Sequence, residues 1–208
     1  MSVLKLPSTV AAIENLRPTQ MTVGFREAAI KRARLRESGL TRRHLAERKR
    51  IPVIYGPQKR PYVIDGHHQL LALHGEGVEE VLISIVEDMS ALDSDSFWQL
   101  LSKKGWTHPF DAEGRRCAFS DMPNSLTSLI NDPFRSLSNE LKRRGGYTKC
   151  SAPFSQCRWA DVLRNKIDRS LIDNDFTGTI KIAMKLVARD EFCFLPGWRP
   201  NSIKSETL

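Results

Sequence analysis

A run of patterned segments in the first half of the chain constrains the fold most strongly. A helical pattern at 25–36 precedes two short runs rich in branched and aromatic residues, "IPVIY" at 51–55 and "YVID" at 62–65. A Leu-rich helical segment at 67–75 and a third strand-like run at 78–88 complete the series. The order helix, strand, strand, helix, strand predicts an α/β unit in which "GPQKR" closes a hairpin between the first two strands.

Local signals set the expected helix boundaries. Gly39 is expected to end the first helix, and Thr41 is expected to cap a second basic helix. Residues 16–24, "LRPTQMTVG", read as a short extended segment before the first helix. The apolar face of that helix is expected to carry Phe25, Ala28, Ala29 and Ala33.

The character of the sequence changes after Asp88. A capped helix in "DSDSFWQLLSKKG" and a Pro/Gly-bounded loop in "WTHPFDAEGRR" lead into a mainly helical remainder. The further helices are expected at 123–131, 133–144, 158–169 and 177–190. The sequence therefore predicts an α/β core over 1–90 and a helical extension over 91–208, either fused into one globule or separate.

The positive charge of the chain is concentrated in one segment. The formal net charge is +8, and residues 26–50 hold ten Lys or Arg against three Glu. One interpretation is an electrostatic surface for phosphate, on a nucleotide or on nucleic acid. The other is a pair of solvated helix faces, and the sequence leaves both open.

No apolar run approaches the roughly 18–20 residues that a membrane-spanning helix needs. The amino-terminal residues also show no leader pattern. We therefore expect a cytoplasmic protein without membrane contact.

The junction Asp65-Gly66-His67-His68 collects groups with chemical potential where a strand passes into a helix. The first N–H groups of a helix attract an anion, and Gly66 allows the main chain to approach that anion closely. His67 and His68 can add ring N–H donors, whereas Asp65 is suited to hold Mg²⁺, orient a histidine or accept a proton. The simpler alternative is that Asp65 is the N-cap of the helix.

The motifs resemble those of a known family. "YVIDGHHQLLAL", preceded by "LRPTQMTVG", is similar to the ParB/sulfiredoxin superfamily and specifically to its ParB-like nuclease branch. "GWTHPFD" (105–111), "RWADVLR" (158–164) and "FLPGW" (194–198) look like later motifs of that branch. The resemblance implies a ParB/sulfiredoxin-like α+β core with a mainly helical carboxy-terminal extension, in which residues 1–90 bind phosphate.

The resemblance also implies chemistry. The corresponding loop binds a nucleoside triphosphate in ParB and ATP in sulfiredoxin, and free-serine kinases of the superfamily have a similar Asp-Gly-His-His turn. The kinase pattern often continues with an arginine where this chain has Gln69, so Arg26, Lys31 or Arg60 would have to supply that charge. Glu27 corresponds loosely to a kinase general base; its alternative is a surface ion pair.

These arguments lead to a site and a function. The expected phosphate site comprises Gly66, His67, His68 and Gln69 with Arg26 and Lys31; the expected catalytic residues are Asp65, His67, His68 and Glu27. Mg²⁺ on Asp65 and a nucleotide (ATP, ADP or CTP) are the expected cofactors of a phosphotransferase or phosphohydrolase. The alternative is a DNA-binding partition-like protein or nuclease that uses residues 26–50 on the DNA phosphates.

Other candidates each have a structural alternative. Thr19 and Gln20 could contact a ligand or close a turn. His108 and Asp111 could form an acid–base pair or a loop held by an Asp turn. Trp159, with Phe154, Arg158 and Arg164 nearby, could stack on bases, although its helical spacing favours core packing; Trp198 is expected to pack the carboxy-terminal tail.

Overall fold

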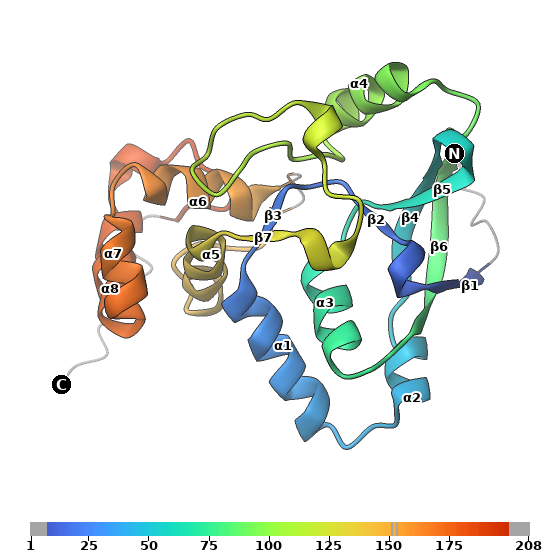
Figure 1. The fold of residues 1–208 in the computed structure, drawn as a ribbon. Helices are drawn as coiled ribbons and strands as arrows, with labels where there is room; N and C mark the ends of the chain where they lie inside the picture. Colours follow the sequence, from blue (N-terminus) through green and yellow to red (C-terminus); the bar gives the residue numbers. More distant parts are fainter. Residues whose placement is uncertain (1–7, 151, 153, 200–208) are drawn as a thin grey trace. The chain divides into compact units, whose positions relative to one another are not determined.

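The computed structural model describes residues 8–150, 152 and 154–199 (Figure 1). The chain divides into two compact units, Met1–Asn131 and Asp132–Leu208. The sequence predicts a change of architecture near residue 90, whereas the compact units divide at Asn131. The reason is that residues beyond 90 pair and pack with the first unit: β7 pairs with β3, and α4 packs on the sheet.

The first unit is built on a five-stranded mixed sheet in the order β1-β6-β4-β5-β2. The strands are β1 (Ser8–Ala12), β2 (Arg17–Pro18), β4 (Ile51–Gly56), β5 (Arg60–Val63) and β6 (Glu80–Asp88). β4 and β5 form the predicted antiparallel hairpin, and β4 pairs parallel with β6. β2 adds to β5 in parallel, so the segment after β2 runs past the end of β5.

A separate two-stranded parallel ladder joins β3 (Thr22–Val23) to β7 (Ile130–Asn131). The helices of this unit are α1 (Phe25–Glu37), α2 (Arg42–Glu47), α3 (His67–Gly75) and α4 (Ser94–Lys104). Short 3-10 helices occur at Ile13–Asn15, Pro57–Lys59, Phe119–Asp121 and Leu126–Ser128. The helices expected after Gly24 and Gly66 are confirmed, as is Thr41 as the N-cap of α2, where its side chain accepts the His44 N–H.

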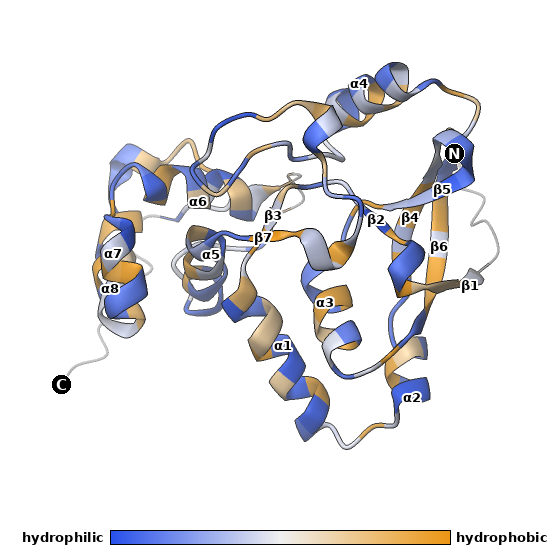
Figure 2. Ribbon diagram, viewed as in Figure 1, coloured by the Kyte–Doolittle hydropathy of each residue, from blue (hydrophilic) through white to orange (hydrophobic). Residues whose placement is uncertain are grey.

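The core of the first unit lies between the sheet and α3. Leu70 and Leu73 of α3 are buried with Ile51, Val53 and Val63 of the hairpin. The hydrophobic stretch of β6 that packs into the same cluster is visible in Figure 2. A second cluster holds α4, where Phe97 and Leu101 are buried and the rings of Tyr62, Phe97 and Trp98 contact one another. Burial of these apolar side chains fixes the strand–turn–helix junction on a rigid base.

The second unit is helical. It consists of α5 (Pro133–Arg143), α6 (Ser155–Arg164), α7 (Arg169–Asn174) and α8 (Phe176–Val187), with a 3-10 helix at Asp190–Phe192. Its core contains Leu137, Tyr147, Trp159, Leu163 and Ala183. The predicted mainly helical extension is therefore present in this unit.

Three local predictions are wrong. Residues 123–131 form a 3-10 turn and β7 instead of a helix, because the Ile130 N–H donates to the Met21 carbonyl in the ladder with β3. The helix expected at 158–169 ends at Arg164. A separate helix begins at Arg169, with Asp168 as its N-cap. The apolar face expected for α1 is also incorrect: Phe25, Ala29 and Ala33 are exposed, and the buried positions are Glu27 and Leu35.

No helix in the described part of the chain is both long and apolar enough to span a membrane.

Candidate functional site

The junction between β5 and α3 has an unusual backbone. Gly66 adopts φ 97° and ψ 13° in the left-handed region, and α3 begins at His67 without a capping side chain. This backbone conformation favours glycine. In addition, a Cβ atom at position 66 would lie only 3.3 Å from Ile51 Cδ1, so a side chain there would be in tight contact with Ile51. The N-cap is Gly66, and the alternative in which Asp65 caps the helix is wrong.

Asp65 is exposed beside this helix start. Within residues 8–150, 152 and 154–199, its carboxylate makes no hydrogen bond or ion pair. The carboxylate is therefore available to a cation or a proton from outside the chain.

The two histidines are oriented by backbone donors from the other side of the site. His67 is 4% exposed, and its Nε2 accepts the Thr19 N–H at 3.3 Å. His68 Nε2 accepts the Gly24 N–H at 3.1 Å. A backbone N–H can only donate, so Nε2 of each ring carries a lone pair, and the proton of each neutral ring lies on Nδ1. The donor role that the sequence suggests for these rings is thus limited to Nδ1.

The segment from Thr19 to Gly24 is held from three directions. Thr19 Oγ1 donates to the Val63 carbonyl at 2.7 Å, at the end of β5. The Thr19 carbonyl accepts from Thr107 Oγ1 and from the His108 N–H, each at 2.9 Å. The motifs "LRPTQMTVG", "VIDGHH" and "GWTHPFD" therefore meet at one place, which the sequence does not reveal.

The start of α1 joins this cluster. The Gly24 N–H reaches His68, and the next N–H, of Phe25, donates to Asn131 Oδ1 at 2.9 Å. α1 and α3 pack against each other, so two helix amino termini lie close together (Figure 1). Both termini carry partial positive charge, which favours a negatively charged group near them.

Glu27 lies in the first turn of α1 and is 6% exposed. Its carboxylate is 3.5 Å from Lys31 Nζ, so the predicted ion pair exists, but at a buried position rather than on the surface. Arg26 is exposed on the same turn, and Gln69 is half-buried in α3. The structure thus gathers Glu27, Arg26 and Lys31 on one helix that is bonded to the turn at 65–68.

The pair of His108 and Asp111 has a structural role. Asp111 accepts hydrogen bonds from the Glu113 and Arg115 N–H groups at 3.0 and 2.8 Å, and from Arg115 Nε at 2.8 Å. Partial burial raises the pKa of Asp111, but the hydrogen bonds and charge of Arg115 outweigh it and hold this pKa below its usual value. Asp111 is therefore an anion that closes a turn, as the structural alternative predicts. His108 is buried, and its ring contacts Phe110.

The motifs of the second unit hold that unit together. Trp159 is fully buried, stacks on Tyr147 with ring centroids 4.6 Å apart, and donates from Nε1 to the Pro196 carbonyl. Arg164 bridges Asp132 and Asp161, each at 2.6 Å. Core packing of Trp159 is confirmed, and a base-stacking platform there is excluded. Trp198 donates to the Val187 carbonyl and packs the tail as predicted.

The basic segment at 26–50 is partly neutralised within the chain. Arg32 and Arg36 contact Glu76 at 2.6 and 2.7 Å, and Arg43 contacts Glu47 at 3.1 Å. Four exposed cations of the segment make no ion pair or hydrogen bond through their side chains to any described residue: Arg34, Arg48, Lys49 and Arg50. The ion-paired arginines support the interpretation as solvated helix faces, whereas the four unpaired cations leave the interpretation as a phosphate-binding surface open.

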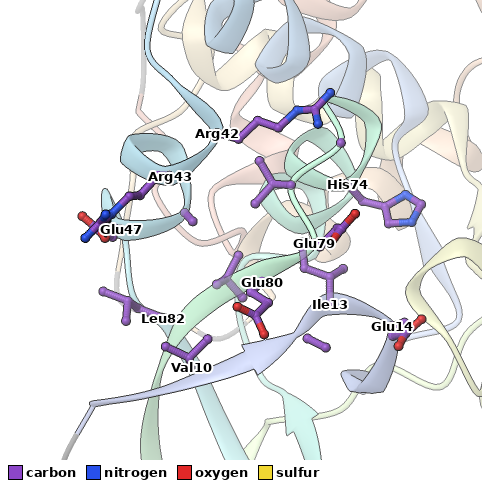
Figure 3. Close-up of a pocket in the computed structure, with 15 residues that line it drawn as sticks. Val10, Ile13, Glu14, Arg42, Arg43, Glu47, His74, Glu79, Glu80 and Leu82 are labelled. Carbon is purple, nitrogen blue, oxygen red and sulfur yellow. Dashed lines mark hydrogen bonds and ion pairs between the residues drawn. The ribbon is translucent and has the colours of Figure 1, made fainter.

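A pocket of about 1000 Å³ lies elsewhere in the first unit, between β1, β6, α2 and the carboxyl end of α3 (Figure 3). None of the residues predicted for the phosphate or catalytic site lines it, whereas Arg42 and Arg43 of the basic segment do. Its walls carry Glu14, Glu79 and Glu80, and Arg42 Nε is already bonded to the Glu76 carbonyl. The pocket is distinct from the turn at 65–68 because other residues line it, and its carboxylates make it poorly suited to an anion.

Two residues of the site escape sequence reasoning. Thr107 lies in a recognised motif, but nothing in the sequence indicates that its hydroxyl bonds Thr19. Asn131 lies in a segment that the sequence predicts as helix, whereas it ends β7 and binds the start of α1. Their positions follow from long-range packing, which local patterns do not encode.

The mixed sheet, the strand–Gly–His–His–helix junction and the helical second unit together define a ParB/sulfiredoxin-like α/β protein. A family model described as "Putative ParB-like nuclease" matches residues 9–165, and the chain belongs to this family. The crystal structure of protein Atu1540 from Agrobacterium tumefaciens is similar, with 44% identity, a TM-score of 0.88, and coverage of 93% of this chain and 98% of that one.

A second solved structure is much less similar. The C-terminally truncated chromosome-partitioning protein ParB from Caulobacter crescentus, complexed with CTP-gamma-S, shares 12% identity at a TM-score of 0.33, over 89% of this chain and 94% of that one. A likeness this weak does not transfer a ligand to this chain. No curated protein matches the sequence.

Proposed function

We propose that the turn Asp65–His68 binds the phosphates of a nucleotide or phosphate ester, and that the chain catalyses phosphoryl transfer or phosphate-ester hydrolysis there. The observation that carries the proposal is the start of α3, where a left-handed Gly66 leaves the helix without a capping side chain beside the exposed carboxylate of Asp65. The helix start favours an anion, and the carboxylate favours the cation that accompanies phosphate.

Each surrounding residue has a role in this proposal. The N–H groups that follow Gly66, with Gln69, surround the phosphate oxygens. The Thr19 and Gly24 N–H groups fix the orientation of the His67 and His68 rings. In this proposal, the fixed rings would stabilise charge that develops on the phosphoryl group. Arg26 and Lys31 on α1 add positive charge in place of the arginine that Gln69 replaces.

The metal and the base complete the proposed mechanism. No group of three or more His, Cys, Asp or Glu that could hold a metal occurs in the described part of the chain, so Asp65 would share Mg²⁺ with phosphate oxygens and water, as Mg²⁺ sites in nucleotide enzymes commonly do. Bound Mg²⁺ would neutralise phosphate charge. Glu27 would accept the proton of the attacking hydroxyl or water as the bond to the leaving oxygen breaks.

The test compares binding and turnover of matched variants of the full chain. ATP, ADP, CTP and tripolyphosphate are titrated with and without Mg²⁺, and phosphate release is measured. We expect Asp65→Asn to reduce the Mg²⁺-dependent part of binding and turnover. His68→Ala should lower kcat by about a hundredfold or more, the usual cost of one transition-state donor.

His74→Ala is the control, because His74 is an exposed histidine at the other end of α3. Circular dichroism would be used to check that each variant is folded. Absence of binding to every phosphate compound, in wild-type protein at low salt, would overturn the proposal.

DNA binding is the second candidate function. The observation in its favour is that Arg48 and Arg50 are exposed and make no ion pair or hydrogen bond through their side chains to any described residue. The double variant Arg48→Gln/Arg50→Gln should weaken duplex binding. The number of phosphate contacts inferred from the slope of log affinity against log salt should fall by up to about two. Lys181→Gln/Lys185→Gln on α8 removes the same charge elsewhere and should have no effect. Equal salt dependence in both variants would contradict this function.

A further inference from the structure

Two large apolar side chains are exposed near the start of α1. Phe25, the first residue of α1, is 48% exposed, and Ile130 of β7 is 52% exposed. The two belong to adjacent stretches of chain, because Thr22 pairs with Ile130 and the Phe25 N–H donates to the Asn131 side chain. A single exposed apolar residue is ordinary, but an aromatic and an aliphatic side chain together at a polar site are a candidate contact surface.

The backbone at Phe25 is fixed in place on both sides. The preceding N–H, of Gly24, donates to His68 Nε2 at 3.1 Å, and the Phe25 N–H donates to Asn131 Oδ1 at 2.9 Å. Because consecutive Cα atoms are about 3.8 Å apart, the Phe25 side chain starts close to the His68 ring. A group joined to a phosphate at Gly66–His68 therefore has Phe25 within reach. An aromatic side chain on an immobilised backbone loses little freedom on binding.

We propose that Phe25 is the surface on which the base of a bound nucleotide stacks, so that the ligand of the turn is a nucleotide and not a phosphate ester without an aromatic ring. The proposal rests on the phosphate-binding function proposed above for the turn. Stacking on an aromatic side chain tolerates any base, because every base has a π face. Phe25 has no hydrogen-bonding group to select a base, so this contact accepts purines and pyrimidines alike.

The experiment separates the base from the phosphates. Isothermal titration of the full chain with ATP, CTP and tripolyphosphate, at one Mg²⁺ concentration, gives three dissociation constants for each variant. We expect wild-type protein to bind ATP and CTP more tightly than tripolyphosphate. Phe25→Ala should weaken both nucleotides by about 5- to 150-fold, the range for loss of one stacked base, and leave tripolyphosphate unchanged.

Further variants distinguish stacking from general apolar contact. Phe25→Trp should retain tight nucleotide binding, whereas Phe25→Leu, which keeps an apolar side chain without the ring, should bind nucleotides nearly as weakly as Phe25→Ala. Phe194→Ala is the matched control, since Phe194 is 72% exposed in the second unit. It should bind all three probes like wild type.

The outcomes are distinct. Equal affinity of wild type and Phe25→Ala for ATP and CTP overturns the stacking proposal, while continued tripolyphosphate binding leaves the phosphate site intact. Failure of wild type to bind tripolyphosphate, ATP and CTP overturns both proposals. Equal loss of tripolyphosphate and nucleotide binding in Phe25→Ala also contradicts stacking, because it shows that Phe25 supports the turn itself.

Discussion

Replacing Gly66 with alanine tests the central feature of the site. Gly66 has φ 97°, and an L-residue in the left-handed region costs about 1–2 kcal/mol. The added Cβ would also lie 3.3 Å from Ile51 Cδ1, so fully buried Ile51 must move by a few tenths of an ångström. We therefore expect Gly66→Ala to lower the free energy of unfolding by about 1–2 kcal/mol or slightly more.

Gly39→Ala provides a control for the backbone cost. Gly39 has φ 64°, and nothing lies within 4 Å of a Cβ built at that position, so its alanine variant carries the conformational strain without the contact. Urea unfolding followed by circular dichroism should show a loss of about 1–2 kcal/mol in this variant too. Only Gly66→Ala should also weaken ATP binding, by about tenfold or more, because in the proposed site only the main chain at Gly66 would approach the nucleotide.

The result that refutes this reasoning is specific. If Gly66→Ala is as stable as wild type, the turn does not hold position 66 in the left-handed region. If it loses stability but binds ATP as wild type does, the helix start is a structural turn and not a ligand site. If Gly39→Ala loses ATP binding equally, the effect on binding follows from stability alone.

Three further predictions concern the surroundings of the site and the second unit. Asn131→Ala should cost about 1 kcal/mol in urea unfolding, because the Phe25 N–H loses its acceptor; Asn131→Asp should retain that stability, and Asn165→Ala on the exposed end of α6 serves as control. Asp111 has a folded pKa below its unfolded value, so its contribution to stability is complete above the unfolded pKa and is lost as pH falls through the folded one. Arg115→Gln should therefore reduce the pH dependence of the unfolding midpoint in the acid range, and an unchanged dependence contradicts the assignment. Trp159→Ala should cost about 3–5 kcal/mol in thermal unfolding, against about 0.5 kcal/mol or less for exposed Phe194→Ala; similar losses for both would show that Trp159 is not in a core.

Local sequence signals predict most elements of the first unit. The hairpin of β4 and β5, the helix after Gly66 and the Thr41 cap all depend on contacts between neighbouring residues, and the structure confirms them. The failure at residues 123–131 has a long-range cause. Residues 123–131 have acceptable helical spacing, but β7 gains its hydrogen bonds from β3, far away in the sequence. Pattern alone cannot weigh such a long-range pairing.

The candidate site divides in the same way. The sequence identifies the turn at 65–68, because an acid, a glycine and two histidines between a strand and a helix are visible without a structure. It assigns the histidines as donors, whereas the structure shows Nε2 of each ring accepting a backbone N–H. It also places the ion pair of Glu27 on the surface, whereas the carboxylate is buried.

The sequence by itself determined the family, the α/β core and the position of the turn, because these depend on residue types at short, fixed spacings. Only the tertiary structure decided which groups meet at the turn. Thr19, Thr107 and Asn131 take part in hydrogen bonds between residues 48 to 106 positions apart in the sequence. Those contacts form because burying α3 against the sheet brings the ends of β2, β5 and α1 together, and burial is a property of the packed chain rather than of any local pattern.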